Sequence, residues 1–230
     1  QTRYKGFVMS KIVFIGGGKG GVGKSLVTMA TVDVLLTRGE SVVLVESDDS
    51  NPDVYKALNG LVQSVVLNLD DEDGYLSLCS VIESNPSAYV VINTAARATK
   101  PIIQHGGIVS DTVKELKREM VMLWAMNRQR DSIELLRDFL DGMGGEFTAT
   151  HAVLNTYWGA PEKFMRFNNS KQKDRVTSAI SFPELNDMVS DKLNDNRLAL
   201  SNAEAGMTIG ERSVLSRFRK AANEALNGVL

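Results

Sequence analysis

The chain has 230 residues and a formal net charge of −2, with 43% hydrophobic and 23% charged residues. This length suits one α/β domain that can bury a core without covalent staples, and the small charge gives no whole-protein attraction to nucleic acid or anionic lipid. The single cysteine, Cys79, excludes an intrachain disulfide and is typical of a reducing compartment, which favours a cytoplasmic location. No apolar run approaches the roughly 20 residues of a membrane-spanning helix, so we expect no membrane insertion.

The first eight residues are expected to lie outside the folded part of the chain. Met9, followed by Ser10 and Lys11, resembles a native start, and residues 1–8 contain no apolar signal core. We therefore interpret residues 1–8 as an expression remnant and residues 9–230 as one domain.

Strand-like and helix-like segments alternate along that domain. Residues 11–15 form an apolar run rich in β-branched side chains and followed at once by glycines, which predicts a buried strand. In residues 24–38 apolar side chains recur at helical spacing until Gly39, which predicts a helix. The same criteria predict further strands at residues 41–46, 89–92, 120–124, 149–154 and 179–182, and further helices at residues 53–58, 76–83 and 132–140.

Alternating strands and helices of this kind predict an α/β fold with a mostly parallel, doubly wound sheet and helices on both faces. Ligands of such sheets bind at the carboxyl ends of the strands. Residues 186–230 are polar and helical, and an apolar stripe on their final helix is expected to cover the sheet or a subunit interface. The stripe consists of Val214, Leu215, Phe218, Ala222 and Leu226.

A glycine-rich motif follows the first predicted strand. Residues 18–25 (GKGGVGKS) match the phosphate-loop pattern G-x-x-x-x-G-K-[S/T] between a predicted strand and a predicted helix. Glycines let backbone N–H groups approach phosphates closely, and the helix N-terminus adds positive partial charge. We expect Lys24 to reach the β- and γ-phosphates of ATP and Ser25 to bind Mg²⁺. The residues predicted to contact the nucleotide here are Gly18, Lys19, Gly20, Gly21, Val22, Gly23, Lys24, Ser25 and Leu26.

Lys19 distinguishes this motif from an ordinary phosphate loop. A cation so early in the loop cannot easily fold back onto its own nucleotide, but it could reach a nucleotide in a facing subunit. There it would stabilise charge on the transferring phosphoryl group. The alternative is a solvated surface lysine.

Residues 19–25 resemble the deviant Walker A signature of the ParA/MinD family of ATPases. The resemblance implies one P-loop ATPase domain over residues 9–230 that forms a homodimer in the ATP state, with Lys19 and Lys24 taking part in hydrolysis. Three further segments, at residues 54–59, 154–159 and 173–176, more closely resemble the plasmid proteins StbB and TraL. These are ParA-like ATPases encoded with plasmid stability and conjugal transfer functions, which implies a plasmid-encoded protein partner.

Acidic and amide residues follow two of the predicted strands. In the family an Asp-x-Asp pair stands where this chain has Glu46 and Asp48. Asp48 matches the second Asp, which helps to orient the attacking water, and Glu46 could touch the magnesium shell through water. A solvated turn is the alternative for both. Asn93 stands where the family usually has Asp, so it brings no negative charge to a metal site made of Ser25, Glu46, Asp48 and Asn93. The resemblance therefore implies a weak ATPase with catalytic residues Lys19, Lys24 and Asp48.

Two later positions are candidates for contact with the base. In the family an Asn at the position of Asn155 often reads the adenine edge, and amide geometry suits adenine. Pro183 matches a second loop that flanks the base. The alternative for Asn155 is a turn residue at the end of a strand.

Two clusters of basic residues are candidates for contact with DNA phosphates. ParA-type proteins bind DNA in this way, without sequence preference. Solvated faces are the alternative. The first cluster is Lys171, Lys173 and Arg175, and the second is Arg212, Arg217, Arg219 and Lys220.

The sequence thus predicts an ATP-dependent dimerising ATPase that acts in plasmid stability, partition or conjugal DNA transfer. Two alternatives remain open. Asn93 also suits a non-hydrolysing ATP-binding adaptor. A small-molecule ligase on the same loop would need catalytic lysines near the γ-phosphate, and none is clearly placed in the sequence.

Overall fold

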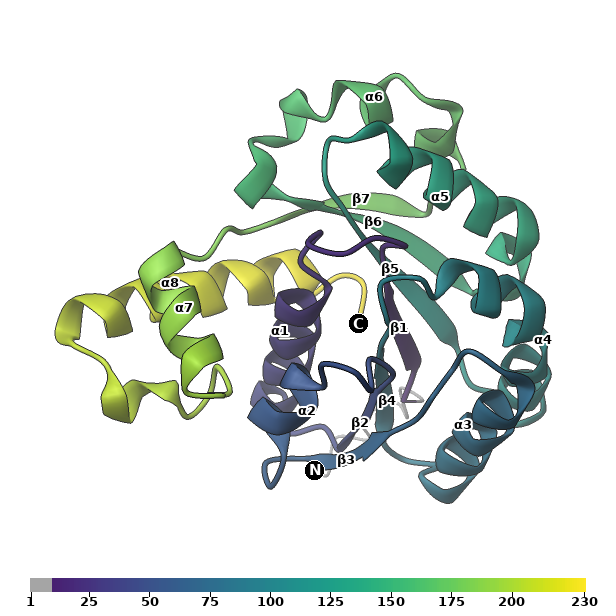
Figure 1. Cartoon of the computed structure of the whole chain (residues 1–230), viewed down its shortest axis with the longest axis horizontal. Coiled ribbons are helices and arrows are strands. Elements are labelled where there is room, and N and C mark those ends of the chain that lie inside the picture. The colour runs from purple at the N-terminus through teal and green to yellow at the C-terminus, as the bar shows by residue number, and fades with distance from the viewer. Residues whose placement is uncertain (1–9) are drawn as a thin grey trace, which may run out of the picture.

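The computed structural model describes residues 10–230, so the predicted expression remnant at residues 1–8 lies outside the described part of the chain. Seven strands form one sheet in the order β3-β2-β4-β1-β5-β6-β7, and every pairing is parallel. The predicted α/β class is confirmed (Figure 1). The strands are β1 (Ile12–Gly16), β2 (Val42–Glu46), β3 (Gln63–Val66), β4 (Tyr89–Asn93), β5 (Met120–Met126), β6 (Ala149–Asn155) and β7 (Ser178–Phe182).

Helices cover both faces of this sheet (Figure 1). They are α1 (Lys24–Thr37), α2 (Asp53–Leu58), α3 (Glu72–Ser84), α4 (Thr99–Glu115), α5 (Arg130–Gly142), α6 (Met165–Asn168), α7 (Asp187–Asp195) and α8 (Ile209–Leu226). Short 3₁₀ helices add η1 (Gly144–Glu146), η2 (Thr156–Trp158), η3 (Pro161–Lys163), η4 (Lys171–Asp174) and η5 (Ala203–Gly206). Within residues 10–230, none of the helices is both long and apolar enough to cross a membrane.

The central strand β1 is buried at every position, as expected for a strand with helices on both sides. Its side chains alternate between two cores because successive residues of a strand point to opposite faces. Val13 and Ile15 pack into the core that contains α1, α7 and α8, whereas Ile12 and Phe14 pack into the core that contains α3, α4 and α5. Burial on both faces holds the carboxyl end of β1, and therefore the glycine-rich loop, in a fixed place.

The final helix α8 covers the sheet, which is one of the two roles predicted for it; the other was a subunit interface. Leu215, Phe218, Ala222 and Leu226 of the predicted stripe are buried against α1 and β7, and Val214 is partly buried there. The contact with α1 also includes a two-pronged ion pair, in which the Arg219 guanidinium donates to both carboxylate oxygens of Asp33 at 2.9 Å.

The sequence did not predict β3, α4 or the short helix α6. Strand β3 is a short edge strand with partly exposed side chains, so its apolar pattern is weak. Helix α4 contains Pro101, Gly106 and Gly107, which ordinarily mark turns. Pro101 lies in the first turn, where an N–H has no intrahelical acceptor. Gly106 makes room for Met143, since a Cβ there would lie 2.8 Å from its Cε atom.

Candidate nucleotide-binding site

A cavity of about 360 Å³ lies at the carboxyl edge of the sheet, within the size range of small-molecule sites. Its walls come from the glycine-rich loop, the segments after β2, β4 and β6, and helix α7. The predicted site residues that line it are Gly20, Gly21, Gly23, Lys24, Ser25, Leu26, Asp48, Asn93 and Asn155. The structure therefore brings together residues from four separate parts of the chain.

Several positions of the loop favour glycine because of a positive φ angle, among them Gly21 at 75°. Gly18 and Gly23 have φ angles of 60° and 101°, which other residues rarely adopt. A Cβ on Gly23 would lie 2.3 Å from Asn155 Nδ2, and one on Gly18 would lie 2.7 Å from Thr99 Oγ1. Between them, Gly20 and Gly21 are exposed, and a Cβ there would meet no described atom within 4 Å. The loop is thus held at both ends and open in the middle.

Asn155 is the anchor at one end. Its buried side chain donates from Nδ2 to the Val22 carbonyl at 3.0 Å and accepts at Oδ1 from Tyr157 N at 3.1 Å. The amide keeps one further N–H and one further lone pair, so the predicted contact with adenine is compatible with this anchoring. The described lining of the cavity does not include Pro183, which is half-buried, but includes Leu185 in the same loop.

Lys24 is a buried amine whose hydrogen bond is to a neutral group. Its side chain belongs to a residue only 8% exposed, and Nζ donates to the Lys19 carbonyl at 2.8 Å. Burial lowers the pKa of Lys24 to about 8, and the more distant Asp48 and Glu46 carboxylates oppose that shift only in part. A desolvated cation at the wall of a glycine-lined cavity fits an anionic ligand such as a phosphate.

Glu46 and Asn93 form a buried network behind the cavity. They end neighbouring strands in register, and Asn93 Nδ2 donates to both carboxylate oxygens of Glu46 at 3.0 Å. Asp48 N adds a third bond to Oε1 of Glu46 at 2.9 Å, and Thr28 Oγ1 donates to Asn93 Oδ1 at 2.9 Å. Burial raises the pKa of Glu46, and the bonds from Asp48 N and Asn93 oppose this rise. Position 93 brings no carboxyl group of its own and lies directly beside the carboxyl group of Glu46 on β2.

The residues at the mouth of the cavity suit a magnesium ion that is shared with phosphates. Ser25 is exposed at the start of α1, and Asp48 lines the cavity while its Oδ1 accepts from Ser50 Oγ at 2.7 Å. Among residues 10–230 no group of three or more His, Cys, Asp or Glu side chains is placed to hold a metal ion. Mg²⁺ bound to nucleotides takes one or two protein ligands plus phosphates and water, which agrees with this sparse set.

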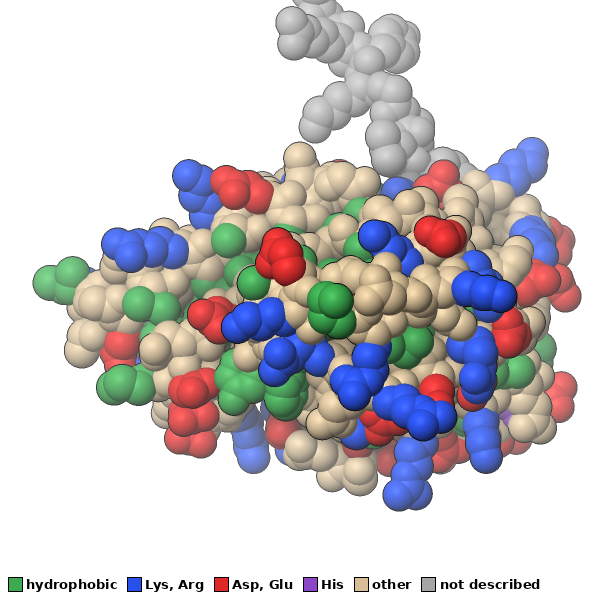
Figure 2. All heavy atoms as spheres, turned by 90° about the horizontal axis from the view of Figure 1, so that it is seen from above, with side chains coloured by type: hydrophobic (Ala, Val, Ile, Leu, Met, Phe, Trp, Pro, Cys, Tyr) green, Lys and Arg blue, Asp and Glu red, His purple; other side chains and the backbone are tan. Residues whose placement is uncertain are grey.

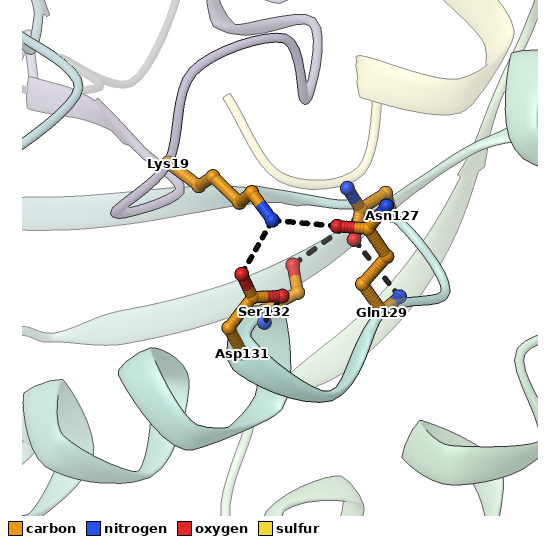
Figure 3. A network of polar contacts seen from close by, with 5 residues as sticks. All are labelled: Lys19, Asn127, Gln129, Asp131 and Ser132. Carbon is orange, nitrogen blue, oxygen red and sulfur yellow. Dashed lines mark hydrogen bonds and ion pairs between the residues drawn. The ribbon is translucent and has the colours of Figure 1, made fainter.

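Lys19 does not point into the cavity (Figure 3). Its Nζ donates to Gln129 Oε1 at 2.6 Å and forms an ion pair with Asp131, both at the start of α5. Sequence reasoning missed Gln129 and Asp131. Their position just beyond the carboxyl end of β5 was the signal that could have identified them, since ligands of parallel sheets collect at such ends.

The basic clusters are exposed but partly neutralised. Figure 2 shows Lys and Arg side chains spread, among acidic ones, over the face that lies at the top of Figure 1. Lys171 and Lys173 are exposed in the β6–β7 connection, whereas Arg175 pairs with Asp141 at 2.7 Å. In the second cluster, Arg219 is tied to α1 as described above.

Two curated proteins are similar to the chain over nearly its whole length. Protein MobD from Acidithiobacillus ferrooxidans is 44% identical over 227 residues, which cover 96% of this chain and 99% of MobD. Protein TraL from Escherichia coli is 26% identical over 243 aligned positions, which cover 95% of this chain and 98% of TraL. The predicted resemblance to TraL is confirmed.

Solved structures share the fold. The MinD cell division protein of Aquifex aeolicus matches with a TM-score of 0.55 at 16% identity, over 96% of this chain and 98% of MinD. A nucleotide-binding protein from Archaeoglobus fulgidus, solved in complex with ADP, matches with a TM-score of 0.53 at 14% identity, over 86% of this chain and 89% of that protein. No protein-family model matches the chain. The chain belongs to the same family as protein MobD, and it shares the fold of the MinD cell division protein.

Proposed function

We propose that the chain binds ATP with Mg²⁺, forms a homodimer in the ATP state and hydrolyses ATP weakly, in the service of plasmid stability, partition or conjugal DNA transfer. The observation that carries this proposal is Lys24, a buried amine that forms no ion pair within residues 10–230 and lies beside an open glycine loop. The family relationship to MobD and the similarity to TraL support the plasmid context.

In the proposed complex the phosphates lie along the exposed backbone of Gly20 and Gly21, and Lys24 moves from the Lys19 carbonyl to the β- and γ-phosphates. Ser25 provides a hydroxyl ligand for Mg²⁺, which neutralises charge on the same phosphates. The base occupies the end of the cavity near Asn155 and α7.

Hydrolysis requires a positioned water. Asp48 is the candidate for this role because it lines the cavity and its carboxylate is oriented by Ser50 Oγ and by Asn51 N at 3.1 Å. Glu46 contributes negative charge from behind Asn93. These residues act by positioning and electrostatics, which dominate phosphoryl transfer.

The non-hydrolysing adaptor remains a second candidate, and one observation favours it. Both ends of the Asn93 amide are engaged within the protein, by Glu46 and by Thr28. A side chain committed in this way holds the magnesium shell less directly than an Asp would. Multiple turnovers of ATP in the presence of the partner protein would remove this candidate.

Sedimentation of the full chain with no nucleotide, with ADP and Mg²⁺, and with ATP and Mg²⁺ tests the proposal. Of these three conditions, we expect only ATP with Mg²⁺ to produce a dimer. The Lys24→Ala variant should stay monomeric, because it lacks the buried cation that binds the phosphates. Lys117→Ala, an exposed lysine before β5 at the opposite edge of the sheet, is the matched control and should dimerise as the wild type does. A wild-type chain that stays monomeric in saturating ATP would contradict the proposed function.

A further inference from the structure

Lys19 is held within its own chain by two acceptors at the start of α5 (Figure 3). The side chains of Lys19 and Asp131 are 36% and 47% exposed, so water reaches the ion pair. Exposed pairs are worth up to about 1 kcal/mol, which is about a fivefold change in an equilibrium constant. The contact is therefore strong enough to bias the position of Lys19 and weak enough to be released by a binding event.

The loop that carries the acceptors is ordered without help from Lys19. Asn127 Oδ1 accepts from Gln129 N at 2.9 Å, and Ser132 Oγ accepts from Asn127 N at 3.3 Å. Asp131 Oδ1 accepts from Ser132 N at 3.1 Å, which leaves Oδ2 for Lys19. Because these bonds fix the loop, Gln129 and Asp131 stay in place when the lysine leaves.

The backbone of Lys19 has a separate link to the candidate nucleotide site. Lys24 Nζ donates to the Lys19 carbonyl, and this bond is lost when Lys24 turns to a phosphate. Beyond Lys19 the loop is unobstructed at Gly20 and Gly21. Nucleotide binding thus removes one restraint on Lys19 directly and leaves the contacts with Gln129 and Asp131 as the other.

We propose that Asp131, assisted by Gln129, is a positioning residue that holds Lys19 in its own subunit and sets the ATP concentration and protein concentration at which the dimer forms. This inference rests on the proposed function, in which Lys19 reaches a nucleotide in a facing subunit. One ammonium group cannot pair with Asp131 and lie at that nucleotide at the same time. A two-fold dimer requires the release of Lys19 in both subunits, so the free-energy cost of breaking the contact with Asp131 enters the dimerisation equilibrium twice.

The first test compares Asp131→Asn with the wild type by sedimentation of the full chain in ATP and Mg²⁺. Asn keeps the size of the side chain and removes its charge. We expect the dimer dissociation constant to fall by about four- to 25-fold, that is, about two- to fivefold for each lysine. Asp138→Asn is the matched control, because Asp138 lies exposed on the same helix and pairs with Arg137; it should change nothing. An Asp131→Asn chain that dimerises no better than the wild type overturns the inference.

The second test examines Lys19 in the monomer without nucleotide. Limited acetylation with acetic anhydride, read by mass spectrometry, reports how freely each amine reacts. We expect Lys19 to react about two- to fivefold faster in Asp131→Asn than in the wild type, while Lys117 serves as an unchanged internal reference. Equal labelling of Lys19 in both proteins overturns the positioning role of Asp131. That result is independent of the proposed function, which falls instead if the wild type and Asp131→Asn both stay monomeric in ATP.

Discussion

At the scale of single residues, this chain differs from the family pattern at Glu46 and Asn93, where the family usually has Asp. The two side chains occupy register partners on adjacent strands and are both buried. One carries a carboxyl group and the other an amide that donates to it. This chain therefore has one buried acid at this place, on β2, where the family pattern has an acid at both positions.

Asn93→Asp should destabilise the protein, although it restores the residue that the family usually has. It would place two buried carboxyl groups within hydrogen-bonding distance and remove the donors that Glu46 uses. We expect the free energy of unfolding to fall by about 2–4 kcal/mol at pH 8. The loss should shrink toward pH 5, because a like charge raises the pKa of a carboxyl group and one proton then relieves the repulsion.

Urea denaturation at both pH values measures this effect. The double variant Glu46→Gln, Asn93→Asp is the matched control, because it keeps one acid and one amide with their positions exchanged. It should recover most of the lost stability. Equal stability of Asn93→Asp and the wild type at pH 8 would show that Glu46 is not held as an acceptor.

At the scale of elements, Arg118 joins the amino-terminal ends of β1 and β4 to the carboxyl-terminal end of α3, on the side of the sheet opposite the cavity. Its buried guanidinium donates to the Ser10 carbonyl at 2.9 Å, to Ser10 Oγ at 3.1 Å and to the Asn85 carbonyl at 3.2 Å, and also to the Ala88 carbonyl. Burial lowers the pKa of Arg118. These acceptors precede β1, follow α3 and precede β4, so one side chain ties three elements together.

Arg118→Met should cost about 3 kcal/mol of unfolding free energy, because it leaves several buried carbonyl groups without donors while keeping an apolar stem. Arg137→Met on α5 is the matched control, since Arg137 is half exposed and pairs only with its neighbour Asp138. That variant should stay within about 0.5 kcal/mol of the wild type in urea denaturation. An equally small effect of Arg118→Met would contradict the proposed stabilising role of the Arg118 hydrogen bonds.

At the scale of the whole molecule, the net charge is −2, and basic side chains lie among acidic ones on the face drawn in Figure 2. The β6–β7 connection carries the exposed residues Lys171 and Lys173, and this is the surface on which we place the proposed contact with DNA. Dimerisation would double the number of such lysines on one particle. ATP should therefore strengthen binding to DNA, because a dimer contacts the duplex through two such surfaces at once.

The double variant Lys171→Ala, Lys173→Ala should weaken binding to any duplex in the presence of ATP. The slope of log affinity against log salt should become less steep by about 1.8 per subunit bound, because each lysine that meets a phosphate releases about 0.9 counterion. Fluorescence anisotropy with a labelled duplex at several salt concentrations measures the slope. Lys114→Ala, Lys117→Ala near the opposite edge of the sheet is the control. Equal slopes for both variants would exclude this face as the DNA-binding surface.

The sequence by itself determined the fold class, the position of the phosphate loop and most of the helices and strands. Those features depend on local spacing: apolar runs bounded by glycines, helical periodicity, and a motif whose glycines serve one backbone geometry. Strand β3 and helix α4 escaped prediction for different reasons. An exposed edge strand has a weak apolar pattern, and Pro101 and Gly106 ordinarily mark turns, although the first turn of α4 accepts the proline and packing against Met143 explains the glycine.

Only the tertiary structure decided which distant side chains meet. Lys19 pairs with Asp131, 112 positions along the chain, and Asn155 anchors Val22 over a separation of 133. No local pattern encodes such contacts, because the strand order, and not the distance along the chain, places the ends of β1, β5 and β6 side by side. The same order sets Glu46 against Asn93, so the amide at position 93 donates to the carboxylate of a residue 47 positions earlier in the chain.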